Sequence, residues 1–194
     1  LPVMLAAFYG LRRSEVVGLK WDAIDFENKT IAIRHTVTAC TEKGRRIEVA
    51  ADTTKTASSR RTLPLVPAFQ TKLAALKEQQ EKNRILCGRS YCTDYPGYVL
   101  VDAMGNRLKL SYISTAFPAL LKRNGLRPIR FHDLRHSCAS LLLKNGVPMK
   151  QIQEWLGHSD FSTTANIYAH LDAGSKLTSA QAMEKGLGMA PKPF

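Results

Sequence analysis

Residues 132–136 read His132-Asp133-Leu134-Arg135-His136, which gathers two histidines, an aspartate and an arginine in five positions. On a helix, side chains three and four residues apart share a face, so His132 lines up with Arg135 and His136. Three interpretations are open: a zinc site like the His-x-x-x-His pattern of zinc proteases, an anion site in which Arg135 binds an oxyanion while His132 handles a proton, and a solvated polar helix surface. Zinc is disfavoured, because Arg135 would place a fixed charge beside the metal and no further ligand follows at a familiar spacing.

Apolar periodicity around this stretch predicts mainly helices. The helix that contains it is expected from about 131 to 145, with Gly146 after its end and an apolar stripe of Leu134, Cys138, Leu141 and Leu142. Short helices are expected at 1–9, 14–19, 148–156 and 162–170. Two longer helices are expected: one begins at Pro67 and has a polar second half that ends at Arg84, and the other is capped by Ser111 and ends at Gly125.

Three short alternating segments predict strands, at Thr30–Thr38, Arg46–Ala51 and Arg61–Val66. Gly44 and the polar run 52–60 separate them, so hairpins are the simplest connection. Residues 87–110 are expected to form a loop with short extended pieces. The predicted fold class is therefore mainly α with a small three-stranded antiparallel β-sheet, an α+β arrangement.

Composition narrows the class of protein. The 194 residues suit one domain, or one domain with a tail, and the sequence holds no apolar run long enough to cross a membrane. Lys and Arg number 28 against 16 Asp and Glu, and the net charge of +12 favours a polyanionic partner. Four scattered cysteines favour a reducing cytosol over a disulfide framework, and Cys87 and Cys92 lack a second ligand pair for zinc.

A second candidate anion site lies in Gly10-Leu11-Arg12-Arg13-Ser14-Glu15, where a helix is expected to begin. The guanidinium of Arg12 and the helix N-terminus can bind phosphate together. Glu15 either orients Arg12 or complements the helix dipole.

Two later segments carry further candidates. Lys55 lies in a polar hairpin segment. It is either a solvated residue or a mobile lysine that reaches a nucleic-acid backbone. Gly157 permits a left-handed helix end that would direct His158 outward, and Tyr168 follows ten residues later. A lone tyrosine on a short helix more often packs than reacts.

The order of these residues along the chain resembles the catalytic domain of the tyrosine recombinases, the phage integrase family. The stretch from Gly10 to Glu15 resembles the first arginine box of that family, and residues 132–136 resemble its second box. The hairpin lysine segment is matched by Lys55, which stands ahead of Arg61-Thr62-Leu63-Pro64. Leu156-Gly157-His158 and Ile167-Tyr168 resemble the third box and the nucleophile segment. The resemblance implies a DNA breaking-rejoining fold over 1–171, a C-terminal tail at 172–194 that docks on a neighbouring protomer, and an N-terminal DNA-clamping domain upstream of Leu1.

The resemblance also implies a role for each residue. Tyr168 is expected to attack a DNA phosphate and form a 3′-phosphotyrosyl link, without a metal or nucleotide cofactor. The phosphate oxygens would be bound by Arg12, Arg135 and His158. Lys55 would act as general acid, His132 would accept the tyrosine proton, and Glu15 would support Arg12.

The implied partner is double-stranded DNA, bound by a homotetramer whose isolated domain is a monomer, in the bacterial cytoplasm and not at a membrane. Integration or excision of a phage or mobile element is the expected reaction. A type IB topoisomerase and a catalytically silent DNA-binding regulator on the same fold are the alternatives.

Overall fold

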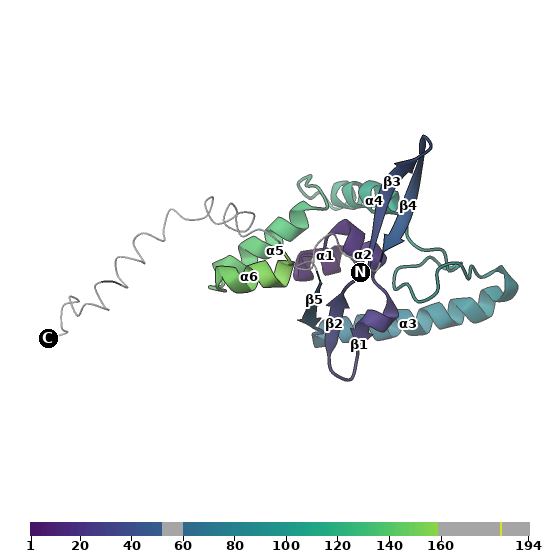
Figure 1. Cartoon of the computed structure of the whole chain (residues 1–194), viewed down its shortest axis with the longest axis horizontal. Coiled ribbons are helices and arrows are strands. Elements are labelled where there is room, and N and C mark those ends of the chain that lie inside the picture. Colours follow the sequence, from purple (N-terminus) through teal and green to yellow (C-terminus); the bar gives the residue numbers. More distant parts are fainter. Residues whose placement is uncertain (52–59, 159–182, 184–194) are drawn as a thin grey trace.

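Six α-helices, two 3₁₀ turns and five short strands make up the described part of this computed structural model, residues 1–51, 60–158 and 183 (Figure 1). The helices are α1 (Pro2–Tyr9), α2 (Arg13–Gly18), α3 (Pro67–Cys87), α4 (Leu110–Arg123), α5 (Asp133–Lys144) and α6 (Met149–Leu156). The 3₁₀ turns are η1 (Trp21–Ala23) and η3 (Gly88–Ser90).

The helix starts confirm the predictions to within two residues for α1, α2, α3, α5 and α6. Gly10 and Gly157 end their helices in the left-handed conformation, with φ of 63° and 68°. The predicted cap at Ser111 is wrong, because α4 begins one residue earlier. Its first amide, Leu110 N–H, donates to the Glu48 carboxylate at 2.8 Å, so a side chain from a distant strand caps this helix.

The strands form two separate antiparallel ladders. A three-stranded sheet has the order β1 (Ile24–Asp25), β2 (Thr30–Ile33), β5 (Arg61–Pro64), and a hairpin pairs β3 (Thr36–Glu42) with β4 (Arg45–Ala51). Lys43 and Gly44 both have positive φ, which matches the twist of a tight hairpin.

The three-stranded sheet is thus confirmed, but its predicted membership is wrong. The segment expected as one strand, Thr30–Thr38, breaks after Ile33 and changes partners. Its buried His35 bonds the Tyr98 hydroxyl at 2.9 Å, and Gly18 packs so closely that a Cβ there would lie 2.7 Å from the His35 carbonyl oxygen. The chain therefore bends at this point, and β3 leaves the sheet to pair with β4.

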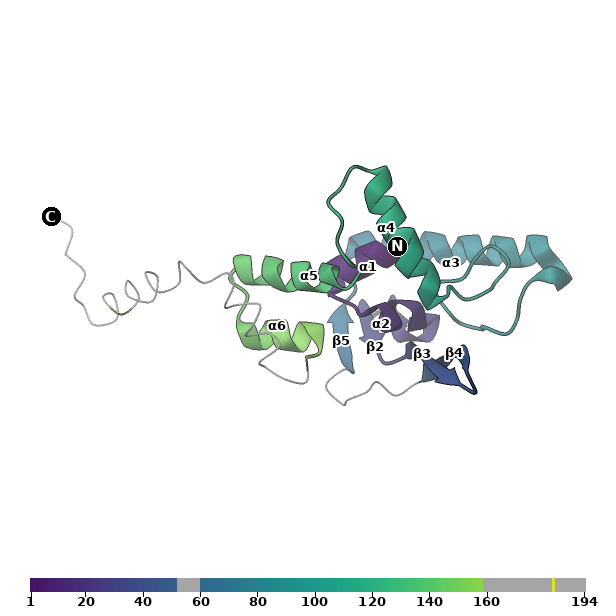
Figure 2. The same cartoon turned by 90° about the horizontal axis from the view of Figure 1, so that it is seen from above.

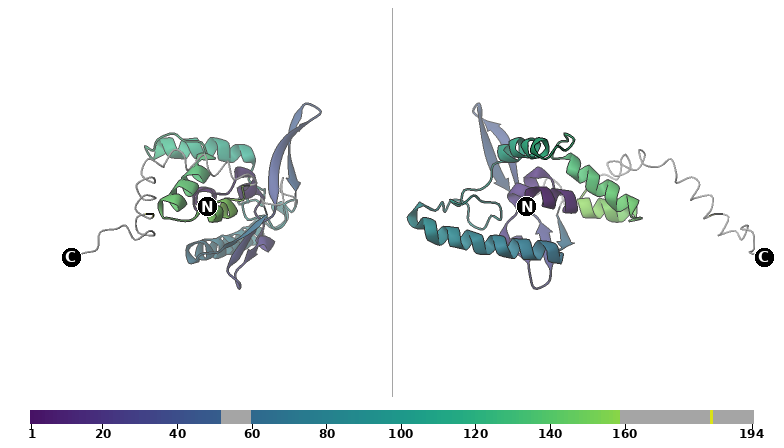
Figure 3. Two further views of the ribbon diagram at one scale, coloured as in Figure 1. Left: turned by 60° about the vertical axis from the view of Figure 1, so that its left-hand side comes forward. Right: turned by 180° about the vertical axis from the view of Figure 1, so that it is seen from behind.

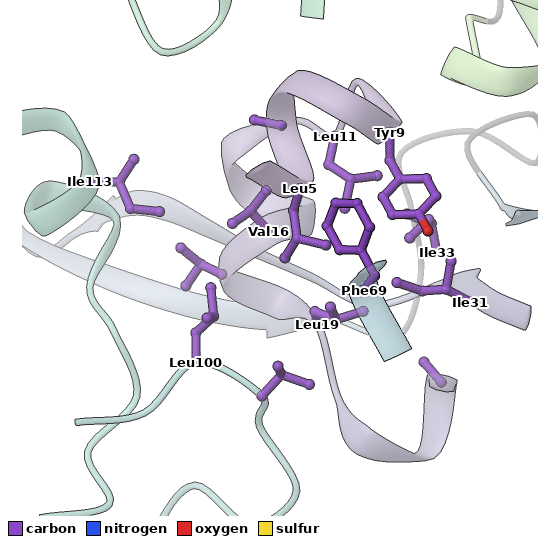
Figure 4. Packing of buried hydrophobic residues seen from close by; sticks show 14 of the residues in the cluster. Leu5, Tyr9, Leu11, Val16, Leu19, Ile31, Ile33, Phe69, Leu100 and Ile113 are labelled. Carbon is purple, nitrogen blue, oxygen red and sulfur yellow. The ribbon is translucent and has the colours of Figure 1, made fainter. Parts of the chain in front are cut away.

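One large hydrophobic core joins α1 to α4 and the sheet, which we call the body. Figure 4 shows its centre, where Leu5, Tyr9 and Leu11 face Phe69 from α3 and Ile31 and Ile33 from β2. A second, smaller cluster of Cys138, Ala139, Ile152 and Leu156 lies between α5 and α6. We call this pair the helical arm, which extends from the body at the end opposite the tip of α3 (Figures 2 and 3).

The predicted stripe of α5 is only partly right. Cys138 is buried, and Leu134 and Leu142 are partly buried, but the side of the helix that carries Leu141 faces solvent, with this residue 62% exposed. Arg135 takes a buried position instead, at 2% exposure. A charged side chain so deep in the fold marks a candidate site.

The four cysteines are free thiols. Within the described residues, no three His, Cys, Asp or Glu side chains gather in a way that could hold a metal ion. No helix in the same part of the chain has both the length and the apolar character needed to cross a bilayer.

Candidate active site

The first part of the site is the start of α2. Arg12 occupies the N-cap position, and its backbone N–H donates to Glu15 Oε2 at 2.9 Å. Its side chain reaches the same carboxylate, with Arg12 Nη1 at 2.7 Å from Glu15 Oε1. Glu15 is only 2% exposed, so Arg12 is held by a buried carboxylate.

The second part is Arg135, on the face of α5 that meets α1. Its Nη1 donates to the Gly10 carbonyl at 2.6 Å. Gly10 needs its left-handed φ to present this oxygen, and a Cβ there would lie 2.2 Å from Leu156 Cδ2. Nη2 of Arg135 is buried and has no hydrogen-bond partner among the described residues. A buried N–H without a partner is costly, and an incoming oxyanion would satisfy it.

Burial, and next the charge of Arg12, lowers the pKa of Arg135 to about 9. The guanidinium therefore keeps its proton at neutral pH. Two arginine cations lie close enough to interact, with Glu15 as the buried carboxylate beside them. Such an excess of positive charge suits a dianionic or monoanionic phosphate.

The third part is the end of α6, where Gly157 turns the chain. Arg12 Nη2 donates to the Gly157 carbonyl at 3.1 Å, and Arg135 Nε donates to His158 Nε2 at 3.2 Å. Burial, followed by the charges of Arg135 and Arg12, lowers the pKa of His158 to about 4. His158 is therefore neutral at pH 7, and because its Nε2 accepts from Arg135, we assign its proton to Nδ1.

His132 lies immediately before α5, and its ring meets that of His136 edge to face at 5.1 Å. Burial, followed by the charges of His136, Arg135 and Arg12, lowers the pKa of His132. A neutral imidazole beside two arginines can accept a proton. Asp133 is engaged elsewhere, because it pairs with Arg130 at 2.8 Å.

Arg61 is the residue that sequence reasoning missed. It lies in β5 with its side chain 6% exposed, and its Nη2 and Nη1 lie 3.0 and 3.2 Å from the two oxygens of Glu15. Its Nε donates to the Trp155 carbonyl at 2.8 Å. A signal was present, since residues two apart in a strand share a face and Arg61 therefore lies on the same face of β5 as the apolar Leu63, which is buried in the structure.

The remaining predicted residues lie outside the described residues. These are Lys55, Tyr168, the predicted helix at 162–170, and the tail at 172–194 except the exposed Met183. The structure thus brings together Arg12, Glu15, His132, Arg135 and His158, although they come from three distant parts of the chain.

A groove of about 650 Å³ borders the site on the side of His132. It lies between α2, β3, α4 and the segment before α5. Its lining includes the basic residues Arg13, Arg46 and Arg130. The cations of the site therefore continue along a surface groove.

Comparison with known proteins gives a consistent result. The sequence matches the phage integrase family over residues 1–174. A tyrosine recombinase XerC-like protein of Caldanaerobacter subterraneus subsp. tengcongensis is 35% identical over 185 residues, which cover 93% of this chain and 47% of that protein. The integrase of Staphylococcus phage L54a is 28% identical over 190 residues, covering 94% of this chain and 51% of that protein.

Solved structures share the fold. The Tn1549 transposon integrase in complex with circular intermediate DNA has a TM-score of 0.75 at 22% identity, covering 93% of this chain and 58% of that one. The catalytic domain of bacteriophage HP1 integrase has a TM-score of 0.54 at 21% identity, and the match covers 93% of this chain and 79% of that one. The expected fold of a tyrosine recombinase catalytic domain is confirmed.

The chain spans about half the length of the relatives described above. The family match covers 1–174 and includes every residue of the boxes described above. The chain therefore belongs to the phage integrase family.

Proposed function

We propose that the chain is the catalytic part of a site-specific DNA recombinase, which cleaves and rejoins DNA through a 3′-phosphotyrosyl intermediate. One observation carries the proposal: Arg12 and Arg135, 123 positions apart, meet at the end of α6, where Arg12 bonds the Gly157 carbonyl and Arg135 bonds His158, and the buried Nη2 of Arg135 has no partner among the described residues. Donors fixed in a desolvated pocket stabilise the charge of a phosphoryl-transfer transition state, commonly the largest single contribution to catalysis.

In the proposed reaction, the Tyr168 oxygen bonds to the scissile phosphorus while the bond from phosphorus to the 5′-oxygen breaks. His132 takes the phenol proton, and Lys55 gives a proton to the departing 5′-oxygen. Arg12, Arg135 and His158 bind the non-bridging oxygens. A 5′-hydroxyl of another strand then reverses the step. Because the phosphotyrosyl link conserves the energy of the phosphodiester, the scheme calls for no nucleotide, and the arginines and proton-transferring side chains take the part that a metal would otherwise play.

Double-stranded DNA is the proposed partner. The net charge of +12 supplies long-range attraction, and the groove that carries Arg13, Arg46 and Arg130 leads to the site. We propose four protomers on two duplexes, with the tail at 172–194 docking on a neighbour, and a bacterial cytoplasmic location.

Movement of a phage or other mobile element is the proposed biological role. Relatives of this kind include the integrase of Staphylococcus phage L54a and the transposase of transposon Tn916 of Enterococcus faecalis, each 28% identical to the chain.

Trapping of covalent adducts tests the proposal. The probe is a library of nicked duplexes with a randomised core. Cleavage releases a short downstream fragment with a free 5′-hydroxyl, and its diffusion away prevents rejoining. We expect protein–DNA adducts that survive denaturation. Tyr168→Phe should abolish them while DNA binding remains, and Tyr112→Phe, on exposed α4, should not change them.

Each of Arg12→Gln and Arg135→Gln should slow adduct formation by about 10²-fold or more. DNA binding without adducts in the unaltered chain would contradict the proposal and favour a silent regulator. Adducts with relaxation of supercoils but no strand exchange between two sites would instead favour a topoisomerase.

A further inference from the structure

The helical arm supplies Arg135 and His158, whereas the body supplies Arg12. The site is therefore assembled across a junction between two hydrophobic clusters. Any change in the angle between arm and body would move the cations relative to one another. A misplacement of about 1 Å can cost about 10²-fold in rate, so something must fix this junction.

Apolar packing at the junction is present but gives little direction. Trp155, near the end of α6, packs against both clusters, and its ring stacks on Tyr9 with an interplanar angle of 19°. Hydrophobic burial is non-directional, so it constrains the angle between arm and body less sharply than hydrogen bonds do.

Hydrogen bonds supply the direction: Arg12 and Arg135 each cross the junction to a backbone carbonyl, and Arg61 crosses it as well. The Arg61 guanidinium holds both oxygens of Glu15 on one side and the Trp155 carbonyl on the other. Glu15 in turn bonds the Arg12 side chain, and Trp155 precedes His158 by three residues. A single planar group with rigid N–H directions thus spans the two halves of the site.

We propose that Arg61 is a positioning residue that sets the arm against the body and so fixes Arg12 and His158 around one phosphate. The expected effect of Arg61 on DNA cleavage rests on the proposed function, whereas its expected effect on the position of the arm does not. The scheme assigns Arg61 no bond to a reacting atom. It acts through Glu15 and through the end of α6.

Three variants of the full 194-residue chain separate positioning from general stability. Arg61→Gln removes both the positive charge and the planar, forked set of N–H donors of the guanidinium. Arg61→Lys keeps a charge beside Glu15, but a single ammonium cannot reproduce the rigid fork that serves Glu15 and Trp155 together. Arg84→Gln is the matched control, because Arg84 pairs with Glu81 on the exposed face of α3, away from the site.

Single-turnover cleavage of the nicked duplex library is the first readout. We expect Arg61→Gln to slow cleavage by about 10²-fold, with DNA affinity changed less than about 3-fold and most molecules folded by circular dichroism. Arg61→Lys should remain slow, and Arg84→Gln should match the unaltered chain. Cleavage by Arg61→Gln within about 3-fold of the unaltered chain, or a loss equal to the unfolded fraction, would overturn the proposal.

The pH profile is the second readout, and a purely structural role would not move it. Burial alone raises the pKa of Glu15, but the charge and hydrogen bonds of Arg61, together with Arg12, hold it below its ordinary value. Arg61→Gln removes the larger of these two influences, so the pKa of Glu15 rises. Cleavage by this variant should then fall more steeply from about pH 7 to about pH 5 than in the unaltered chain, whereas Arg61→Lys should keep the original profile.

Amide hydrogen exchange is the third readout and needs no DNA. The N–H groups of Gly157 and His158 donate to the Gln153 carbonyl at 2.9 and 3.1 Å, so they report on the end of α6. We expect these two amides to exchange at least about 10-fold faster in Arg61→Gln than in the unaltered chain, and at the unaltered rate in Arg84→Gln. If the unaltered chain forms no adduct, the recombinase function fails. Unchanged exchange in Arg61→Gln would overturn the positioning role independently.

Discussion

The body and the helical arm are held by different kinds of interaction. In the body, apolar side chains from α1 to α4 and the sheet pack around fully buried residues such as Leu5, Val16 and Leu73. In the arm, the buried cluster comprises Cys138, Ala139, Ile152 and Leu156. Besides the apolar packing of Trp155, three arginines join the arm to the body: Arg12 to Gly157, Arg61 to Trp155, and Arg135 to Gly10.

This difference shows why the site lies where it does. A large apolar core needs no buried charges, and burying a cation costs free energy unless it is paired. Where the arm meets the body, the same cations that join the two parts also provide a place for an anion. In the proposed function, stability and phosphate binding therefore depend on one group of side chains, with Glu15 at its centre.

Removal of the central carboxylate should have the largest effect. Glu15→Gln leaves Arg61, 6% exposed, without its charged partner, and breaking a buried ion pair typically costs about 3–5 kcal/mol. We expect a loss of this size in the free energy of unfolding, measured by urea titration at neutral pH. Glu81→Gln, which breaks the exposed pair with Arg84, should cost at most about 1 kcal/mol. Equal losses in the two variants would show that the junction charges do not stabilise the fold.

A cavity made in the body should destabilise the whole molecule, whereas a cavity made in the arm should destabilise mainly the arm. Leu73→Ala in the body and Ile152→Ala in the arm each empty a fully buried position, at a cost of about 2–5 kcal/mol. We expect Leu73→Ala to lower the stability of the whole molecule. Ile152→Ala should mainly speed amide exchange in α5 and α6, because local opening of the arm leaves the body packed. Uniformly faster exchange throughout Ile152→Ala would show that arm and body unfold as one unit.

Acid should weaken the junction before it weakens the body. The folded-state pKa of His158 is lowered to about 4 from 6.5 in the unfolded chain. Between these values the unfolded state binds more protons, so His158 makes stability fall as the pH drops from 6.5 toward 4. Protonation also removes the acceptor that Arg135 Nε uses. His158→Gln should flatten the pH dependence of urea unfolding in this window, and an unchanged slope would contradict a neutral buried His158.

Local rules sufficed to predict the helices of the body and arm, whereas the candidate site residues were grouped through the resemblance to the family's boxes. Helix starts followed from periodicity and from proline, and the ends at Gly10 and Gly157 from their left-handed turns. Arg61 was missed because its partners, Glu15 and the Trp155 carbonyl, lie 46 and 94 residues away. The break after Ile33 and the cap on α4 also depend on distant groups, Tyr98 and Glu48. Local propensity contains no information about such pairings.

The smallest expected effect concerns Leu141, which periodicity placed on the apolar stripe of α5. A narrow cluster can cover only part of a helix, and the structure leaves Leu141 62% exposed while Cys138 and Ala139 face α6. Gln has nearly the helix propensity of Leu, so Leu141→Gln should change the free energy of unfolding by less than about 0.5 kcal/mol in urea titration. Leu5→Gln, at a fully buried position of the body, is the contrasting variant and should unfold much of the protein. A loss above about 2 kcal/mol for Leu141→Gln would mean that a further segment covers this side of the arm, because only burial gives a leucine that much stabilising free energy.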